Sequence, residues 1–111
     1  MVYLVGAGPG DEGLITVKGM ECIKKCDTII YDRLGTYQLL DYVKTGCRKI
    51  YVGKKAGTDY ASQDMINKIL VEEGKKKGIV VRLKGGDPYV FGRGTEEVKA
   101  LTDNDIPYEV I

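Results

Sequence analysis

The chain contains no histidine and only three cysteines among its 111 residues. Cys22 and Cys26 lie one helical turn apart, a spacing that two metal ligands can have. Because no histidine or second cysteine pair completes a ligand set, we interpret them as ordinary, partly buried thiols and predict no metal site. An odd number of cysteines favours a reducing compartment, so the expected location is the cytoplasm.

Long apolar runs and a strong excess of one charge are also missing. No apolar stretch approaches the roughly 18 residues of a membrane-spanning helix, so we expect no membrane partner. Met1–Val5 runs directly into a glycine-rich turn and shows no signal-peptide pattern. The net charge of +1 leaves no electrostatic footprint for DNA or RNA, so we expect no nucleic-acid partner. The composition, 43% hydrophobic and 30% charged, is typical of one soluble globular domain.

The apolar pattern alternates between short strands and helices, with no internal repeat or linker. The expected strands are Val2–Gly6, Thr28–Tyr31, Lys49–Val52, Ile79–Leu83 and Tyr108–Ile111. The expected caps of the intervening helices are Thr16, Thr36, Ser62 and Thr95. This alternation, with near-continuous apolar strands, predicts an α/β domain: a mostly parallel open sheet of about five strands with helices on both faces.

Helical spacing also predicts which residues each helix buries. In chain order these are Val17, Met20 and Ile23; Leu39, Leu40 and Val43; Ile66, Ile69, Leu70 and Glu73; Val98 and Leu101. The first helix is expected to run to about Lys25. Gly46 is the expected end of the second helix, and Gly74 and Gly78 compete to end the third.

Glycine and charged residues follow each of the first four strands. The segments are GAGPGD at 6–11, DR at 32–33, GKK at 53–55 and GGDP at 85–88. Ligands of open parallel sheets bind beyond the carboxyl ends of the strands, so we expect one small-molecule site there. Each residue alone also has a structural interpretation, since exposed loops are polar in any case. Gly85 and Gly86 are the most informative, because adjacent glycines let bare backbone approach a ligand.

A dinucleotide-binding loop is one alternative for this site. GPGDEG at 8–13 matches G-x-G-x-x-G, and Asp32 lies about 20 residues further on. In a true fingerprint the first glycine ends the strand, which here is Gly6, and Asp11 then stands where the third glycine belongs. Its carboxylate would repel a pyrophosphate, and Pro9 removes one N–H. S-adenosylmethionine suits the loop better, because it carries a sulfonium and an ammonium and has no phosphate.

Several motifs, taken in order, resemble one known family. They are VYLVGAGPGD at 2–11, IYDRL at 30–34, VGKK at 52–55, Gln63 with Ile66-Asn67, and VRLKGGDPYVFGRG at 81–94. Together they resemble the tetrapyrrole methylases, and within them the uroporphyrinogen-III C-methyltransferases, over essentially the whole chain. The resemblance implies a two-domain fold of which residues 1–111 form the amino-terminal α/β domain, with the second domain absent. We expect the isolated chain to be inactive, because it reads as the first half of a longer enzyme.

The resemblance also implies roles for particular residues. The implied contacts to S-adenosylmethionine are Pro9, Gly85, Gly86, Asp87 and Val90. Asp32 corresponds to the family's proposed proton acceptor, and Lys54 to its proposed proton donor. Arg33 and Arg93 are candidates to bind the carboxylates of the substrate, and Lys54 could do the same instead of donating a proton.

The implied reaction is transfer of two methyl groups from S-adenosylmethionine to uroporphyrinogen III, giving precorrin-2 for sirohaem and cobalamin synthesis. The family usually forms homodimers. Three alternatives stay open: a related methyltransferase acting on a later precorrin, a flavin- or nicotinamide-binding oxidoreductase domain, and a non-catalytic interaction domain. Two features argue against the oxidoreductase: Asp11 stands where the third glycine of a dinucleotide fingerprint belongs, and the GGDP segment follows the fourth strand.

Overall fold

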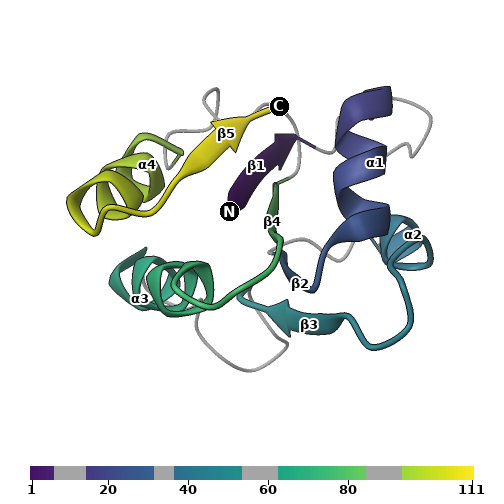
Figure 1. Ribbon diagram of the computed structural model, residues 1–111, viewed down its shortest axis with the longest axis horizontal. Coiled ribbons are helices and arrows are strands. Elements are labelled where there is room, and N and C mark those ends of the chain that lie inside the picture. The colour runs from purple at the N-terminus through teal and green to yellow at the C-terminus, as the bar shows by residue number, and fades with distance from the viewer. Residues whose placement is uncertain (7–14, 32–36, 54–62, 85–93) are drawn as a thin grey trace.

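The computed structural model describes residues 1–6, 15–31, 37–53, 63–84 and 94–111 (Figure 1). The strands are β1 (Val2–Gly6), β2 (Thr28–Tyr31), β3 (Arg48–Tyr51), β4 (Val80–Lys84) and β5 (Tyr108–Val110). The helices are α1 (Val17–Lys25), α2 (Tyr37–Leu40), α3 (Gln63–Gly74) and α4 (Gly94–Asp103). Each expected strand is confirmed, with ends that differ from the prediction by at most one residue.

All five strands belong to one parallel sheet, with the order β3-β2-β4-β1-β5. The predicted open parallel sheet is therefore confirmed. The order itself follows from tertiary packing, because β4 lies between β1 and β2 and separates two strands that are consecutive in the chain.

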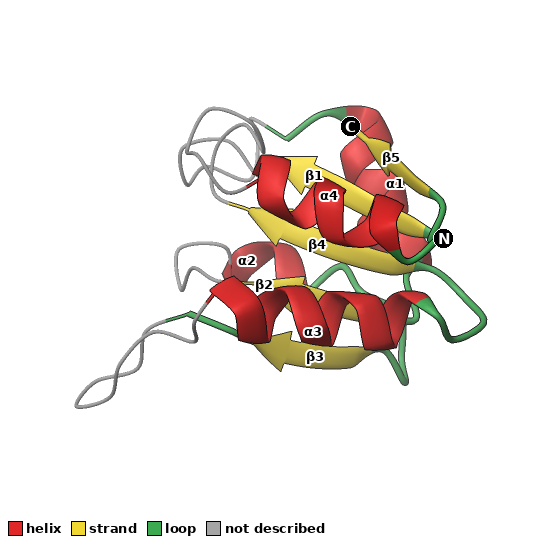
Figure 2. Ribbon diagram, turned by 90° about the vertical axis from the view of Figure 1, so that its left-hand side faces the viewer, coloured by secondary structure: helices red, strands yellow, loops and turns green. Residues whose placement is uncertain are grey.

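Helices cover both faces of this sheet, as predicted. Figure 1 shows α1 and α2 on one side of the strands and α3 and α4 on the other. In Figure 2, α4 lies in front of β1 and β4, and α3 lies in front of β2 and β3. Successive residues of a strand point to opposite faces, so each strand contributes to two cores. On β4, Val81 and Leu83 pack with α1 and α2, whereas Val80 packs with α3 and α4.

The predicted start of α1 is confirmed, but its buried face is rotated. Thr16 caps the helix, and its hydroxyl oxygen accepts a hydrogen bond of 3.0 Å from the N–H of Gly19. Ile23 is buried as expected, whereas Val17 is 80% exposed. The sheet is contacted instead by Gly19 and Cys22. Gly19 is the closest point: a Cβ there would lie 3.0 Å from Val5 Cγ1, so the helix can approach the sheet only through a glycine.

The ends of the other helices correct two expectations and decide a third. α2 ends at Leu40, and Gly46 lies in a later turn with φ of +89°, so Gly46 does not end that helix. α3 ends at Gly74, which settles the competition with Gly78. α4 begins at Gly94, so Thr95 is its second residue and cannot be its cap. Residue type alone favours Thr95 as the cap, but α4 begins two residues earlier than that cap implies.

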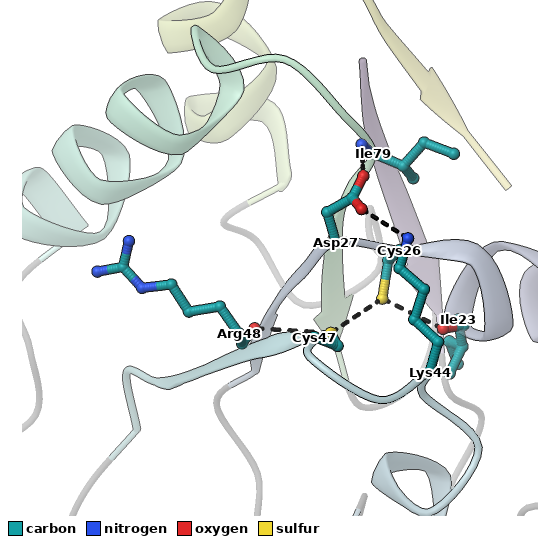
Figure 3. A network of polar contacts seen from close by, with 7 residues as sticks. All are labelled: Ile23, Cys26, Asp27, Lys44, Cys47, Arg48 and Ile79. Carbon is teal, nitrogen blue, oxygen red and sulfur yellow. Dashed lines mark hydrogen bonds and ion pairs between the residues drawn. The ribbon is translucent and has the colours of Figure 1, made fainter.

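A network of polar contacts joins the amino ends of three strands (Figure 3). Asp27 Oδ2 accepts a hydrogen bond of 2.8 Å from the N–H of Ile79, and Asp27 Oδ1 accepts one of 2.6 Å from Lys44 Nζ. The Asp27 carbonyl also accepts from the N–H of Arg48 at 2.9 Å. One residue therefore ties β2 to the segments that open β3 and β4.

Cys26 is part of the same network, and its surroundings confirm an ordinary buried thiol. Its sulfur lies 3.6 Å from Cys47 Sγ and donates to the carbonyl of Ile23 at 3.2 Å. Burial, together with the neighbouring Cys47, raises the pKa of the Cys26 thiol well above its usual range. The thiol is therefore protonated at neutral pH, and it is Cys47, not Cys22, that lies beside it.

Replacing Gly78 with alanine should destabilise the protein by about 2–4 kcal/mol. Gly78 has φ of +115°, and an added Cβ would overlap Asp27 Oδ2, which displaces the acceptor of the Ile79 hydrogen bond. Gly46→Ala is the matched control, because its φ is also positive but no atom lies within 4 Å of an added Cβ. Gly46→Ala should lower the free energy of unfolding by only about 1–2 kcal/mol, the cost of placing a Cβ on backbone with positive φ. Urea unfolding measures both, and equal losses would contradict the role of Asp27.

The Asp27–Lys44 pair should make stability depend on pH at the acidic end. The hydrogen bond from Lys44, and then that from Ile79, lowers the pKa of the Asp27 carboxyl. A lowered pKa in the folded state contributes stability above the unfolded value of about 3.9, and this contribution is lost as the pH falls through the folded value. Asp27→Asn keeps an acceptor for Ile79, so its urea midpoint should lie below that of the wild type at pH 7. The difference should stay nearly constant down to about pH 4, shrink below that pH and vanish once the pH has fallen through the folded pKa. A difference that does not shrink below about pH 4 would contradict the assignment.

Candidate active site

The carboxyl ends of the first four strands lie at one edge of the sheet. The pairing register places Gly6 of β1 beside Lys84 of β4, and Tyr31 of β2 beside both Leu83 of β4 and Tyr51 of β3. The residues that follow these strands therefore leave the sheet at the same edge. The shared edge that the sequence predicted is confirmed.

The sheet also has a topological switch point, between β1 and β4. The connection after β1 passes through α1 on one face and leads to β2, whereas the connection after β4 passes through α4 on the other face and leads to β5. Two neighbouring strands thus send their connections to opposite sides of the sheet. A crevice forms outside the carboxyl ends of such a strand pair, and ligands of open α/β sheets bind there.

The two segments that carry the predicted cofactor contacts leave the sheet at this switch point. Residues 7–14 directly follow Gly6, and residues 85–93 directly follow Lys84. Asp32 directly follows Tyr31, and Lys54 comes three residues after the end of β3. The predicted site residues themselves lie outside the described residues: Pro9, Asp32, Arg33, Lys54, Gly85, Gly86, Asp87, Val90 and Arg93.

Two tyrosines define the edge next to Asp32. The rings of Tyr31 and Tyr51 lie 5.3 Å apart between centroids and are tilted by 48°, an arrangement that is favourable for aromatic pairs. Tyr31 is buried, with 7% of its surface exposed. The pair joins the carboxyl ends of β2 and β3, so the residue that precedes Asp32 is held in a packed layer of the sheet.

A buried cluster of charges lies at the switch point itself, on the face of the sheet that α3 and α4 cover. Glu97, in the first turn of α4, accepts a hydrogen bond of 2.5 Å from Arg82 Nε through Oε1 and one of 2.7 Å from Lys84 Nζ through Oε2. Arg82 Nη1 also donates to the carbonyl of Leu83 at 3.2 Å. Glu97 is fully buried, and Arg82 and Lys84 are 1% and 7% exposed. Removing one partner of a buried pair typically costs about 3–5 kcal/mol.

The sequence analysis did not single out this cluster, although a signal was present. Arg82 and Lys84 interrupt the apolar run of β4 at alternate positions, so both point to one face of the sheet. Glu97 lies in the first turn of the next helix, where the helix dipole favours a carboxylate. Cations inside a predicted buried strand require an anion near them, and the following helix offers one.

The described ranges contain no group of three or more cysteine or carboxylate side chains able to hold a metal ion. None of the helices in those ranges combines the length and the apolar character that crossing a bilayer requires.

Comparison with known proteins supplies the context for this geometry. The profile of the family described as Tetrapyrrole (Corrin/Porphyrin) Methylases matches residues 1–111. The uroporphyrinogen-III C-methyltransferase of Methanocaldococcus jannaschii is 56% identical over 110 residues, which cover 99% of this chain and 46% of that protein. The enzyme of the same name from Bacillus subtilis is 50% identical, over 99% of this chain and 43% of its own length. The chain thus spans about half the length of these curated relatives.

Solved structures agree with the sequence comparison. The native form of uroporphyrin III C-methyl transferase from Thermus thermophilus superposes with a TM-score of 0.85 and is 44% identical, over 99% of this chain and 47% of that one. The structure of that transferase complexed with S-adenyl homocysteine gives a TM-score of 0.82 at 42% identity, over 99% of this chain and 43% of that one. On the strength of the full-length family match, this chain belongs to the tetrapyrrole (corrin/porphyrin) methylases.

Proposed function

We propose that this chain is the amino-terminal domain of a uroporphyrinogen-III C-methyltransferase. The observation that carries the proposal is the 50–56% identity to enzymes of that name along nearly all of the chain. The switch point between β1 and β4 supports it, because ligands of open α/β sheets bind at such a point and the segments implied to contact the cofactor directly follow these two strands in the sequence. The second domain, which the relatives' greater length implies, would complete the site.

The methyl donor in this proposal is S-adenosylmethionine. A Thermus thermophilus relative was solved with S-adenyl homocysteine, the demethylated product of that donor, which supports the same ligand here. Attack by a pyrrole carbon of uroporphyrinogen III on the sulfonium methyl forms a C–C bond and breaks the S–C bond. The ring is left cationic and must lose a proton. Two such transfers give precorrin-2.

The protein's own task is then to align the reactants and to handle one proton. Holding carbon, methyl and sulfur in line supplies much of the acceleration in a transfer of this kind. We assign proton acceptance to Asp32 and carboxylate binding to Arg33 and Arg93. Lys54 takes either the family's proton-donor role or, instead, the binding of a further substrate carboxylate. Pro9, Gly85, Gly86, Asp87 and Val90 are the proposed contacts to the methyl donor. Tyr31, which directly precedes Asp32 in the sequence, packs against Tyr51 at the end of β2.

A related precorrin methyltransferase is the second candidate. The cobalt precorrin-4 methyltransferase structure superposes with a TM-score of 0.82, but at 27% identity, over 99% of this chain and 44% of that one. The lower identity favours the uroporphyrinogen enzyme. The compartment and assembly in this proposal are the cytoplasm and a homodimer. The free cysteines of the chain support the cytoplasm. The family resemblance alone supports the homodimer, and a light-scattering mass equal to that of a monomer would exclude it.

The full-length protein should add two methyl groups to uroporphyrinogen III. We would incubate it without oxygen with S-adenosylmethionine and the porphyrinogen, and count the added methyl groups by mass spectrometry. Two additions are expected. Transfer only to a later precorrin would favour the second candidate. Absence of any transfer, in a protein that binds flavin or nicotinamide instead, would overturn the family's chemistry for this chain.

Asp32→Asn and Arg33→Ala should affect different kinetic constants. Loss of a proton acceptor should lower kcat by about 10²–10⁴-fold while the affinity for S-adenosylhomocysteine stays unchanged. Loss of a carboxylate-binding guanidinium should raise KM for the porphyrinogen more than KM for S-adenosylmethionine. Each of these two variants serves as the control for the other, because the substituted residues are adjacent in the chain but are expected to change different kinetic constants. Equal effects of Arg33→Ala on the two KM values would refute its role.

A further inference from the structure

The buried charge cluster of Arg82, Lys84 and Glu97 connects the two ends of one chain segment. Lys84 is the last residue of β4 and directly precedes residues 85–93, and Glu97 lies in the first turn of the helix that follows them. Glu97 receives one hydrogen bond from each cation, at 2.5 and 2.7 Å. A single carboxylate therefore joins the end of β4 to the first turn of α4, the two elements that flank residues 85–93 in the sequence.

The position of this cluster in the fold matters as much as its contacts. Lys84 pairs in register with Gly6, so it stands at the carboxyl end of the strand pair that forms the switch point. α4 is the connection that leaves this pair on one face of the sheet. The cluster therefore joins the strand and the helix between which the proposed ligand-binding segment runs.

We propose that Glu97 is a positioning residue for S-adenosylmethionine, acting through Lys84 and Arg82. The proposal rests on the proposed function, since it concerns the same site. Joining the two elements that flank a binding segment pre-organises the site and so lowers the entropy cost of binding a ligand. Losing the carboxylate releases Lys84 from α4 at the point where the GGDP segment begins, and ligand affinity falls although Glu97 need not touch the ligand.

The chain offers a control at the opposite edge of the sheet, a buried carboxylate whose two cations are exposed. Glu73, near the end of α3, is also buried and also bridges two cations, Arg48 Nη1 at 3.2 Å and Lys76 Nζ at 2.8 Å. Arg48 opens β3, so this cluster lies at the amino edge, away from the switch point. Loss of either carboxylate leaves a pair of cations without their anion, but only Glu97 stands at the proposed site.

The experiment compares Glu97→Gln with Glu73→Gln in the full-length protein. Isothermal titration with S-adenosylhomocysteine gives both the dissociation constant and the number of binding sites. Glu97→Gln should raise the dissociation constant about tenfold or more, since small misplacements of a positioning group have effects of that size. Glu73→Gln should leave it within about twofold of the wild type. A purely structural role of Glu97 would lower the number of folded sites and leave the constant of the remaining sites unchanged.

A second variant covers the case in which Glu97→Gln does not fold. Lys84→Met keeps an unbranched side chain in place and leaves Arg82 and Glu97 as a one-to-one pair. It removes the link between the strand end and α4, so the dissociation constant should again rise. Wild-type affinity in Lys84→Met, or equal weakening in Glu73→Gln, would overturn the positioning role while leaving the proposed function intact. A wild-type protein that does not bind S-adenosylhomocysteine would instead overturn the proposed function, and this inference with it.

Discussion

Insertion of β4 between β1 and β2 is the constraint on which the rest of this structure depends. Because connections between parallel strands must cross a face of the sheet, placing β4 beside β1 sends α1 and α4 to opposite sides. That divergence creates the switch point. It also brings Gly6 and Lys84, which are far apart in the sequence, to neighbouring positions at one edge. The site is thus a consequence of strand order.

Carboxylate side chains at the two edges of the sheet have different structural roles. At the amino edge, Asp27 satisfies the N–H of Ile79 and Glu73 joins α3 to β3, so the carboxylates there tie elements together. At the carboxyl edge, Glu97 neutralises charge inside the β4 strand itself. Burying ions is expensive, and replacement of a buried ion cluster by apolar residues is often neutral or stabilising, so the contacts of Glu97 are weak evidence for a stabilising role.

Much of the architecture could be predicted because the apolar pattern of each segment is local. The runs at Val2–Gly6 and Thr28–Tyr31 were predicted to the residue, since buried parallel strands are apolar on both faces. The helix ends were harder: α2 stops at Leu40 and α4 starts before Thr95, because caps depend on how the chain enters and leaves a packed layer. Val17 was expected to be buried, but helical spacing alone does not say which of two overlapping stripes meets the sheet.

The sequence by itself determined the strand–helix alternation, the parallel sheet and the family, because each of these is written in local periodicity and in contiguous motifs. It also determined that polar residues follow the strands. Only the tertiary structure decided that β1 and β4 are neighbours, that Tyr31 packs on Tyr51, and that Glu97 reaches back to Arg82 and Lys84. The physical reason is that these contacts join residues distant in the chain. Which residues pair depends on burying the cores on both faces of the sheet at once, and no local sequence pattern contains that information.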